Sequence, residues 1–114
     1  MNAAGFRKIA LSLPGVQPGS HHGVEDFRVG GKIFCTLAYV KQGAGVLMLT
    51  LEQQAGMVAD EPGIFSPVPN GWGRGGATLV HLAKVTPEIL KGAIEVSYRN
   101  RVAKNAPAKR KRTV

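Results

Sequence analysis

The chain has 114 residues, 44% of them hydrophobic, and a formal net charge of +8 at pH 7, so its size fits one domain around one core. Five of its fifteen basic residues lie in the last eleven positions, and the other ten oppose seven acidic residues, leaving +3 for the body. The single cysteine excludes an internal disulfide and suits a reducing compartment. No apolar run has the length of a signal peptide or a membrane span, so we expect a cytoplasmic protein with no membrane association.

The N-terminal segment carries apolar residues at helical spacing. Phe6, Ile9, Ala10 and Leu13 lie three and four positions apart, which predicts a helix over residues 2–13 that ends before Pro14. Residues 15–26 are rich in glycine, proline and histidine and show no period. We expect them to form a long surface loop, and loops of this length often serve a function.

A hairpin is predicted next. Gly30 and Gly31 accept the positive φ angles of a tight turn between strands at residues 27–29 and 32–40. A second turn leads to a third strand at residues 46–49, which gives an antiparallel meander. The low polarity of these strands indicates that helices cover them.

Two further helices are signalled by their caps. Thr50 and Gln53 form a capping box, which predicts a helix from Leu51 to about Asp60. Thr86 before Pro87 is a typical N-terminal cap, and the helix it begins should run to about Val102.

Proline, apolar and charged residues predict the structure around these helices. The three prolines in residues 62–69 predict extended chain, and the apolar run at residues 78–82 predicts a strand. On the last helix we expect Lys91, Arg99 and Arg101 to remain in water.

The predicted fold is α+β, an antiparallel sheet of about four to five strands packed against N-terminal, middle and C-terminal helices. Residues 1–102 should form the single domain. Residues 103–114 have no apolar face to bury, so we expect a disordered basic tail. Its charge is concentrated in Lys109, Arg110, Lys111 and Arg112.

The segment from Asn70 to Gly76 holds the only tryptophan and four glycines. Its glycines match the literal G-x-G-x-x-G spacing, but a dinucleotide site needs them between a strand and a helix, and here a proline-rich segment precedes a strand. The loop can present backbone N–H groups, the Arg74 guanidinium and the Trp72 ring to an anion or a stacked base. Alternatively, Trp72 folds over the core edge and the glycines only permit a tight turn.

Candidate residues for metal binding or catalysis are few. The three histidines and Cys35 show no zinc-like spacing, so no metal site and no cofactor are predicted. His22 beside Asp26 has the composition of an acid/base pair, but no partnered nucleophile is present, and a hydrogen-bonded loop histidine is the simpler interpretation. We therefore assign no catalytic residue and expect a protein that is not an enzyme.

Ordered cationic residues suggest an anionic partner. Arg28 and Lys32 flank the predicted hairpin turn, and together with Arg74 they would form one patch if that turn lies near the glycine-rich segment. The basic tail would add affinity for any polyanion through counterion release.

Several motifs, in order along the chain, together indicate a family. They are His22-Gly23, Asp26-Phe27-Arg28-Val29, Gly31-Lys32 with Phe34, Leu49-Thr50 with Glu52-Gln53-Gln54, Phe65 with Pro67, and Trp72-Gly73-Arg74 with Gly76 and Thr78. In this order and spacing they resemble the MmcQ/YjbR family over nearly all of residues 6–101.

The resemblance implies a CyaY-like (frataxin-like) fold, in which helices cover one side of an antiparallel sheet. It also implies DNA binding, as commonly described for the family. Frataxins use acidic residues along the first helix to bind iron, whereas this helix has Arg7, Lys8 and no acid. Iron binding is therefore not predicted.

Three functional hypotheses follow. The first is a monomeric, non-enzymatic protein that binds DNA with little sequence preference, using Arg28, Lys32, Arg74, Trp72 and the tail. The second is a module, with or without enzymatic activity, that binds a small phosphate- or carboxylate-bearing metabolite in a pocket containing Trp72, Arg74 and His22. The third is a protein-interaction module that uses an exposed sheet edge.

Overall fold

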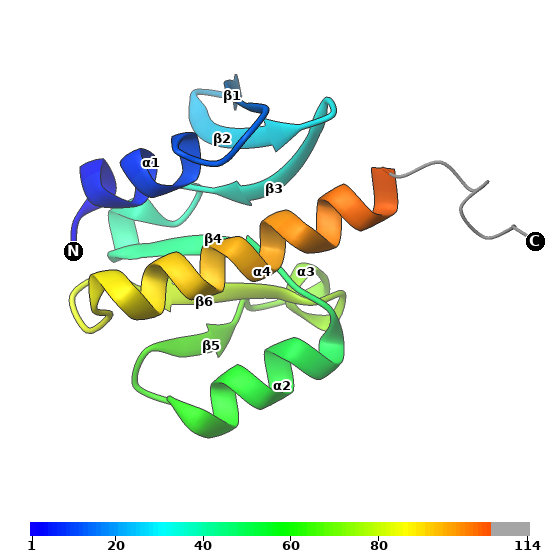
Figure 1. Cartoon of the computed structure of the whole chain (residues 1–114). Coiled ribbons are helices and arrows are strands. Elements are labelled where there is room, and N and C mark those ends of the chain that lie inside the picture. The colour runs from blue at the N-terminus through cyan, green and yellow to red at the C-terminus, as the bar shows by residue number, and fades with distance from the viewer. Residues whose placement is uncertain (106–114) are drawn as a thin grey trace, which may run out of the picture.

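A computed structural model describes residues 1–105 as a six-stranded antiparallel sheet with helices (Figure 1). In chain order the elements are α1 (Ala3–Leu11), β1 (Val16–His21), β2 (Val24–Val29), β3 (Lys32–Thr36), the 3₁₀ turn η1 (Val40–Gln42), β4 (Ala44–Met48), α2 (Leu51–Asp60), β5 (Phe65–Pro67), α3 (Gly71–Arg74), β6 (Ala77–His81) and α4 (Pro87–Asn105). The strands lie in the order β1-β2-β3-β4-β6-β5. This confirms the predicted α+β class.

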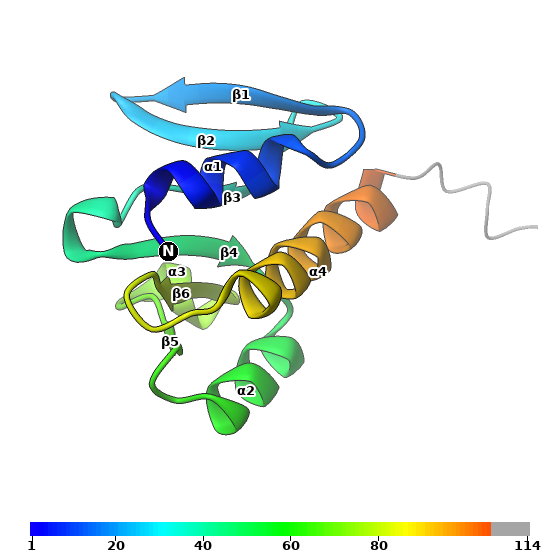
Figure 2. The ribbon, with the colours of Figure 1, turned by 60° about the vertical axis from the view of Figure 1, so that its left-hand side comes forward.

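The main core lies between the sheet and two helices. The views in Figures 1 and 2 place α1 and α4 over the same face of the sheet. Phe6 of α1 packs against Phe27 with ring centroids 6.0 Å apart, and Phe34 meets Tyr98 of α4 edge to face at 5.6 Å. Cys35 is also buried here, and its burial raises the pKa of the thiol.

The opposite face of the sheet carries a smaller apolar cluster made of Val46, Val68 and Ala77. β3 contains a β-bulge. The pairing with β2 steps from Phe27↔Cys35 to Arg28↔Ile33, so one residue of β3 has no partner and the strand can bend there. We call the side opposite α1 and the first turns of α4 the open face, and the last turns of α4 reach its edge at Met48.

The segment predicted as a loop at residues 15–26 is instead a hairpin of β1 and the first half of β2. His22 and Gly23 form its turn, with φ of 55° and 76°, the positive values that a tight two-residue turn requires. Pro18 and Gly19 argued against a strand, but β1 is an edge strand, where a missing ladder hydrogen bond is tolerated.

The glycine-rich segment is also more regular than predicted, because Gly71–Arg74 form the helical turn α3. The Asn70 side chain accepts a hydrogen bond from the Trp72 N–H at 3.0 Å and so begins this turn. Residues 62–69, which were expected to be extended chain without a partner strand, contain β5, which pairs with β6.

Other local predictions are confirmed. The Thr50–Gln53 capping box begins α2 at Leu51, and the Gly30-Gly31 turn has φ of 61° and 78°. Helix α4 ends at Asn105, three residues beyond the expected Val102, so it includes the first residues assigned to the tail. The tail cations Lys109, Arg110, Lys111 and Arg112 lie outside the described residues.

Candidate ligand-binding cavity

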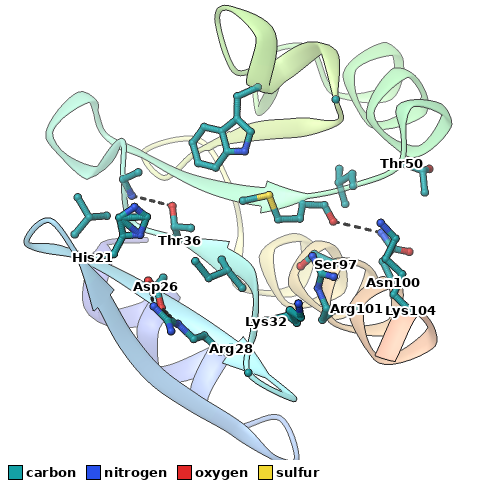
Figure 3. Close-up of a pocket in the computed structure, with 18 of the residues that line it drawn as sticks. His21, Asp26, Arg28, Lys32, Thr36, Thr50, Ser97, Asn100, Arg101 and Lys104 are labelled. Carbon is teal, nitrogen blue, oxygen red and sulfur yellow. Dashed lines mark hydrogen bonds and ion pairs between the residues drawn. The ribbon is translucent and has the colours of Figure 1, made fainter. Parts of the chain in front are cut away.

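A cavity of about 810 Å³ lies on the open face, lined by side chains from β1, β2, β3, β4, α3 and the end of α4 (Figure 3). Its volume falls within the range of small-molecule sites, which is roughly 300–1,000 Å³. A second hollow of about 260 Å³ lies elsewhere, between α2, β5 and the start of α4. The larger cavity is the candidate site because it gathers aromatic, apolar and cationic side chains.

The cavity forms where β3 and β4 separate. Their register covers only Cys35↔Leu47 and Thr36↔Val46 within the described residues. Toward Met48 the last turns of α4 take the place of a neighbouring strand. Asn100 Nδ2 of α4 donates to the carbonyl oxygen of Met48 at 3.4 Å, so helix and strand are in contact at this point.

The lining includes apolar side chains and Trp72. Val24, Ile33, Met48 and Leu49 contribute apolar surface from three strands and the segment after β4. Trp72 is 40% exposed, so it is neither a core residue nor free in solvent. A planar apolar ligand that enters the cavity would therefore meet the indole.

The position of Trp72 depends on a buried amide in α2. Gln54 Nε2 donates to the carbonyl oxygens of Gly73 and Ala77, each at 3.0 Å, which ties α3 and the start of β6 to α2. Gly73 is required because a Cβ at this position would collide with the backbone carbonyl of Val68. These contacts hold α3 at the edge of the cavity.

The charge of the lining is strongly positive. It contains four cationic side chains, Arg28, Lys32, Arg101 and Lys104, and one carboxylate, Asp26, which gives a formal +3 with neutral histidines. Asp26 is buried and accepts from Arg28 Nε at 2.8 Å and Nη2 at 3.1 Å. These hydrogen bonds raise the pKa of the Arg28 guanidinium. Arg28 is therefore already neutralised by a protein partner.

The other three cations have no carboxylate at ion-pair distance within residues 1–105. In Figure 3, Ser97, Asn100, Arg101 and Lys104 project from α4, with Lys32 on the side of the strands. Arg101 Nε is shielded from solvent and has no hydrogen-bond acceptor in the described part of the chain. This end of the cavity thus offers positive charge.

The two histidines of the β1–β2 turn lie at the other side of the cavity. The rings of His21 and His22 meet edge to face with centroids 5.0 Å apart. The pairing of His22 with Asp26, which the sequence left as the less favoured alternative, is not formed, since the Asp26 oxygens accept from Arg28. No group of three or more metal-ligating side chains occurs in residues 1–105.

The structure brings together four of the five ordered residues predicted for anion binding. His22, Arg28, Lys32 and Trp72 all line the cavity, whereas Arg74 is exposed on α3 and is not part of the lining. The predicted patch of Arg28, Lys32 and Arg74 is therefore not one lining surface.

Sequence reasoning missed the contribution of α4. Ser97, Asn100 and Lys104 were not singled out, and Arg101 was expected in water. The only signal was the presence of basic residues near the helix end, which is typical of helices in general because cations there favour the helix dipole.

Comparison with known proteins gives a family and a fold. A family model described as YjbR matches residues 11–100. The crystal structure of Deinococcus radiodurans protein DR2400, which contains a domain of the DUF419 family model, is similar with a TM-score of 0.77. The likeness covers 94% of this chain and 83% of that chain at 16% identity, so it shows the fold alone. No curated protein matches the chain, and none of the helices in residues 1–105 is long and apolar enough to cross a membrane.

Proposed function

The chain belongs to the YjbR family, and from the geometry of its open face we propose that it binds a small ligand with an apolar body and an anionic group. The observation that supports this most strongly is one cavity of about 810 Å³ that holds a half-exposed Trp72, apolar side chains and three cations that have no carboxylate partner within residues 1–105. Such a cavity buries the apolar body of a ligand and leaves a few polar groups to orient it.

Both halves of the cavity favour the same class of ligand. Transferring apolar ligand surface onto Ile33, Met48 and Trp72 is favourable by about 25 cal/mol per Å² of buried area. The formal +3 of the lining favours an anion, and charge-assisted hydrogen bonds are stronger in a partly dehydrated site than in water. A neutral apolar ligand would leave that charge uncompensated.

Trp72 provides the assay, because it is the only tryptophan of the chain and it lines the cavity. The ligands to titrate are benzoate, phenyl phosphate and the neutral benzyl alcohol. The two anions should change the Trp72 emission in a saturable way. The same anions should raise the thermal unfolding midpoint, since a ligand that binds only the folded state stabilises it. If no anion changes either quantity, the proposal is wrong.

A matched pair of variants locates the binding site. Ile33→Glu places a negative charge within the lining and should abolish the emission change, provided that circular dichroism shows a folded protein. Leu51→Glu adds the same charge at a position that is 56% exposed and outside the lining, so binding should be unchanged. Equal binding by both variants would place the ligand elsewhere.

DNA binding is a second candidate, as the sequence first suggested. It is favoured by the presence of Lys32, Arg101 and Lys104 at one end of an ordered surface together with an exposed aromatic ring, which is a typical arrangement for contacting phosphates and stacking bases. Arg28 contributes less because Asp26 already neutralises it. Arg74 and the tail would then add contacts outside the cavity.

A salt titration of binding to duplex DNA tests this second candidate. Each lost phosphate contact lowers the magnitude of the slope of log K against log salt by about 0.9. Lys32→Gln and Arg74→Ala should each reduce the slope if the ordered residues contact phosphates. A slope that is unchanged in both variants and lost on removal of residues 106–114 would contradict a role for the folded domain.

A further inference from the structure

The end of α4 forms one wall of the cavity and is fixed by hydrogen bonds on two sides. Asn105 Nδ2 donates to the carbonyl oxygen of Val29 at 2.9 Å, which joins the last turn of the helix to the β2–β3 hairpin. Asn100 Nδ2 donates to the carbonyl oxygen of Met48 on the other side. Arg101 and Lys104 therefore lie on a wall whose position is set by the sheet.

Arg101 carries the unusual feature of this wall. Its Nε is shielded from solvent and lacks an acceptor within residues 1–105, although a guanidinium N–H is a strong donor. Leaving such a donor buried without a partner costs free energy. The helix dipole accounts for a cation near the C-terminus of α4, but not for a shielded nitrogen without a partner. Because Nε is shielded, a bound ligand would instead contact the outer guanidinium nitrogens of this lining residue.

The charge around Arg101 indicates which kind of anion fits. Lys32 begins β3 directly opposite Val29, the residue to which the end of α4 is bonded, so the hairpin places this lysine on the side of α4. With Lys104, three cations that have no carboxylate partner in the described part of the chain line this end of the cavity. A carboxylate brings one negative charge, whereas a phosphate monoester brings nearly two and three acceptor oxygens.

The apolar half of the cavity adjoins this charged end through Met48. The Met48 carbonyl accepts from Asn100 of α4, and on the other side Met48 is paired with Ala77, which follows α3 and its Trp72. A ligand that extends over Met48 thus reaches α4 at one end and the indole at the other. Tryptophan and methionine side chains both form favourable contacts with planar rings.

We propose that the cavity binds a ring-bearing phosphate monoester, with its phosphate between Arg101, Lys104 and Lys32 and its ring against Trp72. The inference rests on the proposed small-ligand function and adds the chemical class and the orientation of the ligand. Arg101 donates from its outer guanidinium nitrogens to phosphate oxygens, and the two lysines neutralise the remaining charge. No bond is made or broken, because this is a binding site.

The test compares three ring compounds of similar size, followed by Trp72 emission and by calorimetry. Phenyl phosphate should bind about tenfold or more tightly than benzoate, since a further charge-assisted hydrogen bond is worth about that factor, and benzyl alcohol should bind most weakly. Inorganic phosphate should compete with phenyl phosphate. Binding of benzoate as tightly as phenyl phosphate, with benzyl alcohol still weaker, would overturn the assignment of phosphate while leaving the proposed function intact.

Variants of α4 test the orientation. Arg101→Gln should weaken phenyl phosphate about tenfold or more and leave benzyl alcohol unchanged, because only the anion uses the guanidinium. Arg99→Gln removes the same charge two residues away, at a side chain that is 71% exposed, and should change neither affinity by more than about twofold. An equal effect of both variants would show that only the general charge of the helix matters and would overturn the proposal.

Two further variants keep the test informative. Arg101→Lys retains the charge but lacks the planar guanidinium with its several donors, so phenyl phosphate affinity should still fall. Lys104→Gln removes a second cation from the proposed phosphate site at an exposed position of α4. If neither substitution affects phenyl phosphate, the phosphate is not bound at α4. If none of the three ring compounds nor inorganic phosphate binds the wild-type protein, both this inference and the proposed function fail.

Discussion

The buried amide of Gln54 should be one of the more important polar groups in the fold. The perturbation is Gln54→Met, which keeps the length and helix propensity of the side chain but removes both hydrogen bonds to Gly73 and Ala77. Each carbonyl keeps one backbone donor, from the N–H of Gly76 and of Val68 respectively. The loss is therefore two net hydrogen bonds, each worth about 0.5–1.5 kcal/mol, so we expect about 1–3 kcal/mol in total.

Urea unfolding followed by circular dichroism measures this loss. Gln17→Met is the matched control, because the same change is made at an exposed position of the edge strand β1. It should alter the free energy of unfolding by less than about 0.5 kcal/mol. Since Gln54 also ties α3 to α2, its variant should shift the emission of Trp72 to longer wavelength. Equal stability of the two variants would refute the view that Gln54 holds α3 in place.

Three other predictions concern packing, pH and thiol reactivity. Gly73→Ala should lower the free energy of unfolding in urea by about 2 kcal/mol or more, because the new Cβ would collide with the Val68 carbonyl. Gly92→Ala, where a Cβ meets open space on α4, should raise it by about 0.5–1 kcal/mol. Similar effects of the two substitutions would contradict this prediction. Arg7 donates a hydrogen bond to Glu25 and lowers the pKa of that carboxyl group. The pair therefore stabilises the fold above the unfolded pKa of about 4.3, and the contribution is lost as the pH falls through the lower folded pKa. Glu25→Gln should therefore be slightly less stable than wild type at pH 7 and equal to it at low pH, and a difference that persists at low pH would argue against the pair. Because burial raises the pKa of Cys35, the thiol should react with an aromatic disulfide reagent only in the unfolded protein, and rapid reaction of the native protein would show that it is accessible.

Local sequence signals predicted those parts of the fold that short segments determine by themselves. The side chains of Thr50 and Gln53 each accept a hydrogen bond from the other residue's backbone N–H, so the start of α2 could be predicted from the sequence. The Gly30-Gly31 turn was visible because its φ angles favour glycine. In both cases the determining residues are at most three positions apart.

The elements that were missed depend on distant partners. β1 contains Pro18 and Gly19, which disfavour a strand locally, and it forms because β2 supplies hydrogen bonds to its inner edge. The four-residue helix α3 is too short to be stable alone and is held by Gln54 from α2. Neither partner can be inferred from the segment itself.

The candidate site shows the same division. Trp72, Lys32 and His22 were singled out from their own sequence surroundings, and the structure places them in one cavity. Arg101 was not singled out. Helical periodicity indicates which residues share a face of α4, but it does not indicate what lies opposite that face at the end of the helix. That depends on the separation of β3 from β4, which is a property of the whole sheet.

Mapping of ligand-induced shifts by NMR tests the proposed binding site most directly. With ¹⁵N-labelled protein and phenyl phosphate, we expect saturable shifts of the backbone amides of Lys32, Ile33, Trp72 and Arg101, and of the Trp72 indole N–H. Residues of the second hollow, such as Met57, should not respond. Absence of saturable shifts around the cavity, or shifts confined to the second hollow, would contradict ligand binding on the open face.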